Sequence, residues 1–181
     1  MLKRLLLLFI CIVACTVCIS EANNTNKAKV YKEVTNLCKS FGKSCTISER
    51  YDDSLGAFTG PQGKIIVTTG LLDAMNENQL RAVMYHEVGH VVFQHPEKLS
   101  IYLHYCNHNG TCNKDYIEAT RRKDELQADR FAVYVMLFTG KPESLRSALR
   151  VLTPPEDYYT TQPTHPSTAD RIKQIDRIMG R

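Results

Sequence analysis

The sequence predicts an α+β fold that is mainly helical, with a small sheet early in the chain. Residues 64–69 (KIIVTT) are rich in β-branched side chains and form the best candidate strand. Longer segments carry apolar residues at helical spacing. The composition, 43% hydrophobic and 23% charged, argues against a collagenous, low-complexity or disordered chain. The length of 181 residues suits one domain, which we expect over residues 23–181.

In the first half of the chain, the clearest boundary signals belong to a helix that we expect to run to about His95. Asn76 can cap its start, and Pro96 follows its end. Apolar residues repeat at helical spacing between these two points. The other elements expected here are a helix over 26–40, possible short strands within 45–59, a tight turn over 61–63, the strand over 64–69 and helical structure from 71.

The second half of the chain reads as helices separated by polar loops. A polar loop over 106–112 precedes a helix over about 114–139, which stops at Gly140. Pro142 begins a further short helix. A loop rich in Pro and Thr follows over 153–166. The chain then closes with an amphipathic helix whose apolar side holds Ile172, Ile175 and Ile178.

The amino terminus resembles an export signal. Residues 1–4 are basic and residues 5–14 form an apolar run, which is shorter than the roughly 20 residues that span a bilayer. The run 12–15 looks like a bacterial lipobox, which predicts cleavage before Cys15 and a lipid anchor in the membrane. Ordinary signal cleavage near 20–22 and a retained membrane anchor are the alternatives. We therefore expect a signal segment over 1–22 and a protein exported to the bacterial envelope.

The charge of the chain argues against a nucleic-acid partner. The formal net charge is +4, and removal of residues 1–14 takes away Lys3 and Arg4 and lowers it to +2. The chain contains no block of five like charges. We therefore expect a nearly balanced surface and no binding to nucleic acid.

Four cysteines lie in the body of the chain, where an oxidising compartment favours disulfides. They allow three pairings, of which the short spacings favour Cys38–Cys45 and Cys106–Cys112. A metal site built from these cysteines has less support, because the body contains no CxxC motif.

The strongest chemical signal is the HExxH pattern from His86 to His90, which falls inside the expected helix. Residues four apart share one helix face, so both imidazoles can bind one zinc ion. Glu87 lies beside them and can deprotonate a water molecule at the metal. The composition predicts roughly 0.01 accidental matches per chain, so two surface histidines on a core helix are the weaker interpretation.

A catalytic zinc ion needs a third protein ligand. Glu125, on the later helix, is the better candidate, because His95 is followed by Pro96 and is expected to face elsewhere. Asp129 follows Glu125 by four residues and can accept the free N–H of a ligating histidine. The alternative for both acids is a solvated helix face beside the basic residues 121–123.

A third cluster, His165 to Arg171, begins in a loop and ends in the terminal helix. Amide hydrolysis builds an oxyanion, which cationic or N–H donors stabilise. His165 and Arg171 can supply such donors. On position alone, a loop histidine and a surface arginine are the more frequent explanation.

Taken in order, these clusters resemble the HtpX- and Oma-type gluzincin peptidases, a family that also includes the CAAX prenyl endopeptidases. The similar segments are 57–72, 86–90, 125–129 and 165–171. The resemblance is to small secreted or lipoprotein members that have only the catalytic domain, without the multiple membrane spans of HtpX-like members. One departure is Gly56, where relatives often have Asn.

The resemblance implies a zincin-like domain with one zinc ion held by His86, His90 and Glu125, and with Glu87 as the general base. It also implies support from Asp129 and transition-state contacts from His165 and Arg171.

The resemblance further assigns the 64–69 strand as the sheet edge over the cleft, where Ile65, Ile66 and Val67 would pair with an extended peptide. The segment 96–124 is expected to border the cleft. The predicted function is a zinc-dependent endopeptidase that acts on envelope or misfolded proteins. The alternatives are a catalytically silent, zinc-stabilised envelope binding or assembly factor and a purely structural lipoprotein.

Overall fold

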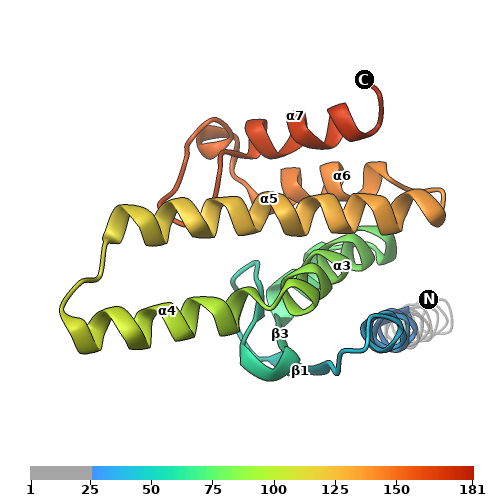
Figure 1. Ribbon diagram of the computed structural model, residues 1–181. Coiled ribbons are helices and arrows are strands. Elements are labelled where there is room, and N and C mark those ends of the chain that lie inside the picture. Colours follow the sequence, from blue (N-terminus) through green and yellow to red (C-terminus); the bar gives the residue numbers. More distant parts are fainter. Residues whose placement is uncertain (1–25) are drawn as a thin grey trace, which may run out of the picture.

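The computed structural model describes residues 26–181 and is mainly helical, with one small sheet, as the α+β prediction requires (Figure 1). After a first helix over 26–40, the elements are β1 (Thr46–Arg50), β2 (Ala57–Thr59), β3 (Lys64–Thr68), α2 (Thr69–Ala74), α3 (Glu77–Phe93), α4 (His95–Asn109), α5 (Lys114–Phe138), α6 (Glu143–Leu152) and α7 (Thr168–Ile178). The predicted signal segment and Cys15 lie outside the described residues. Within residues 26–181, no helix combines the length and apolar character needed to cross a bilayer.

The sheet has the order β1-β3-β2, with β1 parallel and β2 antiparallel to β3. The prediction that the 64–69 strand forms the edge is therefore wrong, because β3 pairs on both sides. Ile65 and Val67 are fully buried and Ile66 pairs with Phe58, so none of the three offers a free main-chain edge to a peptide. The physical reason is that the most apolar strand takes the most covered position, and the short strand β2 is left at the edge.

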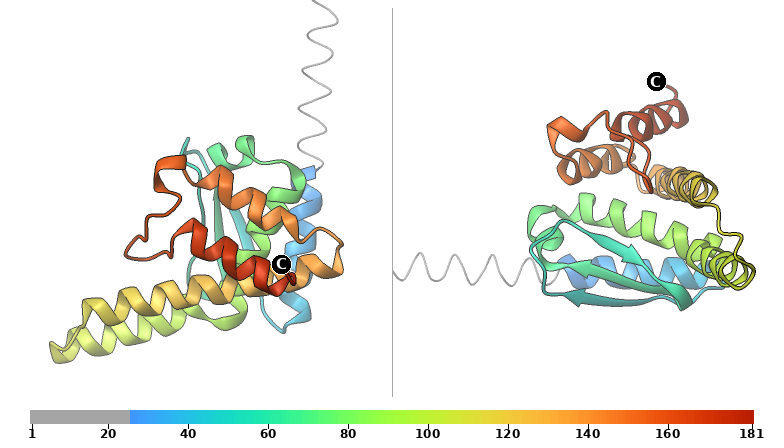
Figure 2. Two further views of the ribbon diagram at one scale, coloured as in Figure 1. Left: turned by 90° about the horizontal axis from the view of Figure 1, so that it is seen from above. Right: turned by 90° about the vertical axis from the view of Figure 1, so that its left-hand side faces the viewer.

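The core lies where the sheet meets the helices. Val30 and Val34 from the first helix belong to the same buried cluster as Ile65 and Val67. Figure 2 shows this helix and α3 against the sheet, while α5, α6 and α7 complete the other side of α3. The helix α3 is thus enclosed by other elements, and eleven of its residues are buried.

The boundaries of α3 follow from its local sequence. The side chain of Asn76 accepts hydrogen bonds from Asn78 and Gln79, and Gln79 in turn bonds back to the Asn76 backbone, which confirms the predicted cap. At the other end, Gln94 has a left-handed φ of 57°, which redirects the chain into α4. The helix therefore ends at Phe93, two residues before the predicted end.

The expected polar loop over 106–112 is only partly correct, because α4 continues to Asn109. We call α4 together with residues 114–124 of α5 the arm, since Figure 1 shows this pair extending beyond the sheet. The rings of Tyr102 and Tyr116 meet across the pair with centroids 4.9 Å apart. Only His95 and Cys106 of α4 are buried, so the arm is held by few contacts.

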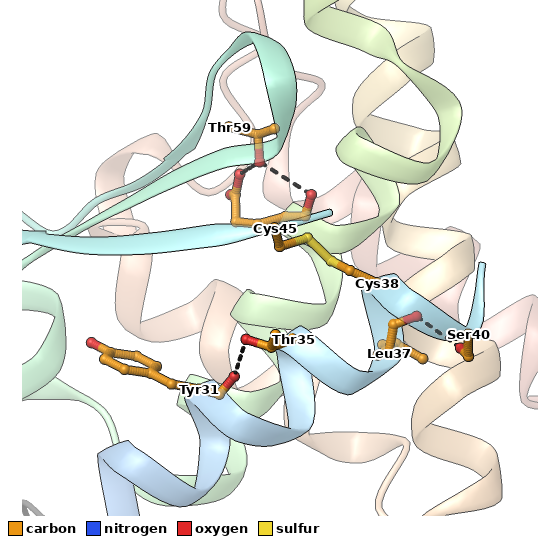
Figure 3. The surroundings of a disulfide bond; sticks show 8 residues. Tyr31, Thr35, Leu37, Cys38, Ser40, Cys45 and Thr59 are labelled. Atoms are coloured by element: carbon orange, nitrogen blue, oxygen red, sulfur yellow. Dashed lines mark hydrogen bonds between the residues drawn. A yellow bond between two sulfur atoms is a disulfide. The ribbon is translucent and has the colours of Figure 1, made fainter. Parts of the chain in front are cut away.

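Both favoured cysteine pairings are present in the structure. Cys38–Cys45 ties the end of the first helix to the start of β1, as Figure 3 shows. Cys106–Cys112 closes the tip of the arm, where α4 turns towards α5. The first disulfide is buried in the core, whereas the second has only Cys106 covered.

Candidate active site

The site is built where α3 crosses α5. A Cβ atom added to Gly89 would lie 3.0 Å from Cα of Ala128 and 3.3 Å from its Cβ. Glycine therefore allows the two helix backbones to approach more closely than another residue would. This close crossing brings the HExxH face of α3 against the acidic residues of α5.

Three side chains from the two helices converge on one point. Nε2 of His86 and Nε2 of His90 are 3.1 Å apart, and the carboxylate of Glu125 lies 3.3 Å from the first and 3.4 Å from the second. One ligand atom from each residue lies within 4.8 Å of the others. Oε2 of Glu125 is buried and accepts no hydrogen bond within residues 26–181. Two imidazoles and a carboxylate with an unsatisfied oxygen together fit a zinc ion.

The surroundings of His86 fix its orientation. Its Nδ1 donates to Oδ1 of Asp129 over 2.9 Å. Arg171 donates hydrogen bonds to both oxygens of the same carboxylate, at 2.7 and 2.8 Å. Asp129 is fully buried, and although burial opposes its ionisation, Arg171 holds its pKa down at about 2. Burial also opposes charge on His86, but Asp129 and Glu125 outweigh it and raise its pKa to about 10. The site therefore stabilises positive charge at the point where a cation would bind.

His95 orients the second histidine, contrary to the expectation that it faces elsewhere. Its Nδ1 lies 2.9 Å from Nδ1 of His90, and its Nε2 lies 3.2 Å from Oε1 of Gln127. Burial is the main cause that lowers the pKa of His95 to about 4, so the ring is neutral. With its N–H donated to Gln127, His95 accepts the Nδ1 proton of His90 and leaves Nε2 of His90 free for a metal. The left-handed turn at Gln94 brings His95 back to the site.

Glu87 is held by a residue of the edge strand. Oγ1 of Thr59 lies 2.6 Å from Oε2 of Glu87 and 3.1 Å from its carbonyl oxygen, the two dashed contacts of Thr59 in Figure 3. The side chain of Glu87 is buried. The structure thus ties β2 directly to the acid beside the metal donors. Sequence reasoning missed Thr59, since nothing in its local pattern indicates a partner 28 residues away.

A cleft of about 560 Å³ opens over these side chains. Its walls come from β2 and the residues before it, α3, the first turn of α4, α5, α6 and the segment 157–168. His165 lies in this cleft, half exposed, with Nε2 3.7 Å from Oε1 of Glu125. Burial lowers the pKa of His165 and favours its neutral form. Arg171 also borders the cleft, but its Nε and one Nη are engaged by Asp129.

Comparison with known proteins agrees with this arrangement. Residues 22–110 and 112–179 match the family model for peptidase family M48. A protease HtpX homolog from Chlorobium phaeobacteroides is 35% identical over 77 residues, which are 40% of this chain and 26% of that relative. The match therefore spans about a quarter of the length of that relative.

Proposed function

Because the chain belongs to peptidase family M48, we propose that it is a zinc-dependent endopeptidase with a zincin-like, gluzincin arrangement. The observation that carries the proposal is the convergence of His86, His90 and Glu125 beside a buried Glu87 in one cleft. We place its substrates among misfolded or envelope proteins. The apolar run over 5–14 and the candidate lipid-attachment residue Cys15 support export and anchoring.

In this proposal, His86, His90 and Glu125 hold one zinc ion. Zinc bound there would supply a Lewis acid that polarises the scissile carbonyl and acidifies water. Asp129 and His95 fix the ring orientations and tautomers of the two histidines, so that each presents Nε2. Arg171 acts through Asp129, because it neutralises and positions that carboxylate, rather than as a donor to the substrate.

Glu87 performs the proton transfers. As general base it takes a proton from the attacking water and then delivers it to the leaving amine. Thr59 donates to Oε2 of Glu87, which leaves Oε1 of Glu87 free to take the proton from the water. His165 reaches the cleft and donates to the oxyanion that forms on the scissile carbonyl.

The edge strand β2 offers the substrate a place to pair. Thr68 donates to the carbonyl of Gly56, and Gly60 donates to that of Lys64, so these positions of the strand face β3. By the alternation of an antiparallel ladder, the main-chain groups of Ala57 and Thr59 point to the opposite side. An extended peptide can add there with little dependence on its sequence.

A casein cleavage assay tests the proposal. The purified protein should cleave casein, lose activity to a chelator and recover it on addition of zinc. Glu87→Gln should bind the same amount of zinc but turn over at least about a hundred times more slowly. The exposed Glu156→Gln serves as a matched control and should cleave normally. Zinc binding without cleavage in the wild type would instead favour the silent binding factor.

A further inference from the structure

Arg121 is a cation of the cleft that the proposed mechanism does not use. It lies on α5 one turn before Glu125 and lines the cleft together with Pro96 and Leu99 of the arm. Its Nε is buried and makes no hydrogen bond within residues 26–181. Buried donors of this kind normally have a partner, and none lies within residues 26–181, so the guanidinium of Arg121 remains available to a ligand in the cleft that it lines.

Three acids of α5 lie one helical turn from Arg121, and none of them forms an ion pair with it among the described residues. Glu118, three residues before Arg121, pairs with Arg122 and Lys114. Asp124, three residues after it, lies 3.4 Å from Nε2 of His95, a neutral ring, and forms no ion pair with Arg121. Glu125 belongs to the metal donors. Among the described residues, the half-buried Arg121 forms no ion pair, although three acids lie three or four residues from it along α5.

The adjacent arginine makes the contrast clear. Arg122 donates to the carbonyl of Pro163 over 2.9 Å and pairs with Glu118, so it fastens the 157–168 segment to α5. Arg121 points instead to the cleft that this segment covers. Arg121 and Arg122 thus carry the same charge in different surroundings. Arg122 is hydrogen-bonded and paired within the protein, whereas Arg121 faces the cleft.

We propose that Arg121 binds a carboxylate of the substrate and thereby determines specificity for an acidic residue near the scissile bond. The inference rests on the proposed peptidase function, because it takes a peptide chain as the occupant of the cleft. A guanidinium forms two parallel hydrogen bonds to a carboxylate, which an amide of the same shape cannot match in charge. Partial burial of Arg121 limits the competition from water and salt.

Peptide binding to full-length, zinc-loaded Glu87→Gln protein tests the inference without cleavage. The probes are peptides with blocked ends that differ by Asp, Asn or Lys at one position, moved along the chain on both sides of the cleaved bond. A parallel set with neutral side chains and a free carboxyl terminus separates a terminal carboxylate from a side chain. Arg121→Gln is compared with the matched control Lys123→Gln, an exposed cation of the same helix, and circular dichroism checks that both variants fold.

We expect Asp to bind at least about fivefold more tightly than Asn at one position. Arg121→Gln should abolish that preference, Arg121→Glu should reverse it in favour of Lys, and Lys123→Gln should retain it. Equal binding of Asp and Asn everywhere, or a preference that survives Arg121→Gln, overturns the inference, as does a preference limited to the free terminus. If the wild type still cleaves the Asn peptides, the proposed peptidase function stands without the inference. Peptides that neither bind nor are cleaved would refute both.

Discussion

The helix α5 runs through two regions that are built differently. From Ala128 to Met136 it carries buried side chains against α3, whereas residues 114–124 carry none and belong to the arm. At the crossing, buried polar side chains bond to one another, as Asp129 does with His86 and Arg171. The arm relies on an aromatic pair and a disulfide at its tip.

The crossing with α3 and the arm differ in the rigidity that their roles require. Two metal donors lie on the enclosed helix α3 and the third, Glu125, lies on α5 three residues before its packed stretch, so the core fixes their geometry. Apart from His95 at its root, the arm supplies only the rim of the cleft, through the first turn of α4 and residues such as Arg121. Substitutions at the crossing should therefore change metal binding and global stability, and equivalent changes in the arm beyond His95 should affect neither.

Asp129→Asn should have the largest effect, because it leaves the buried guanidinium of Arg171 without its counter-charge. We expect the metal-free protein to lose about 3 kcal/mol of unfolding free energy, measured by denaturant titration. Zinc affinity, measured by chelator competition, should fall between tenfold and a hundredfold. The exposed Asp115→Asn in the arm is the matched change, and an equal loss there would break the distinction between the regions.

Gly89→Ala should force the crossing helices apart. The added methyl group would meet the Ala128 backbone, and overpacking of this kind costs about 2 kcal/mol. Zinc affinity should fall as well, since Glu125 moves with α5. Gly60→Ala is the control, because its nearest atom to an added Cβ is 3.7 Å away, and its thermal midpoint should stay unchanged. A stable Gly89→Ala protein with normal zinc affinity would contradict the role of the close crossing.

His95→Ala tests the root of the arm, where the two regions meet. Loss of the partner of His90 Nδ1 frees that ring to change its tautomer and should weaken zinc binding about tenfold. Cleavage at saturating zinc should be affected far less than zinc affinity. His104→Ala, an exposed position further along α4, should bind zinc normally. Equal zinc affinities for the two variants would show that His95 does not support metal binding.

Replacement of both Cys106 and Cys112 by Ser should have the smallest global effect. The arm then opens locally, so its amide hydrogen exchange accelerates while the unfolding free energy changes by less than about 1 kcal/mol. The corresponding double replacement of Cys38 and Cys45, which lie in the core, should cost about 2 kcal/mol. A large loss of stability from the arm disulfide alone would mean that the arm folds as part of the core.

The features that sequence analysis predicted correctly are local ones. The cap at Asn76, the shared face of His86 and His90 and the two short disulfide loops each depend on residues within a few positions of one another. Such signals follow from helix geometry and from the short separation of the residues along the chain. Glu125 was the preferred third ligand from its position on the later helix, the family resemblance implied the same ligand, and the structure brings these donors together.

The features that were missed depend on contacts across the chain. The strand order could not be read from three short strands, so β3 was expected at the edge that β2 occupies. The proximity of His95 to His90 depends on a left-handed turn at Gln94, a residue that carries no strong signal for that conformation. The partner of Glu87, Thr59, lies on a different element altogether.

The continuity of α5 joins the rim of the cleft to a metal donor in one helix. Lys114 lies fourteen residues before Ala128, the point of contact with Gly89, and Glu125 lies only three before it. Because the stretch from Ala128 to Met136 is packed against α3, a bend of α5 beside that stretch displaces the outer end of the helix roughly five times as far as Glu125. A substrate that presses against the rim therefore displaces it much further than it displaces the carboxylate that would bind the metal.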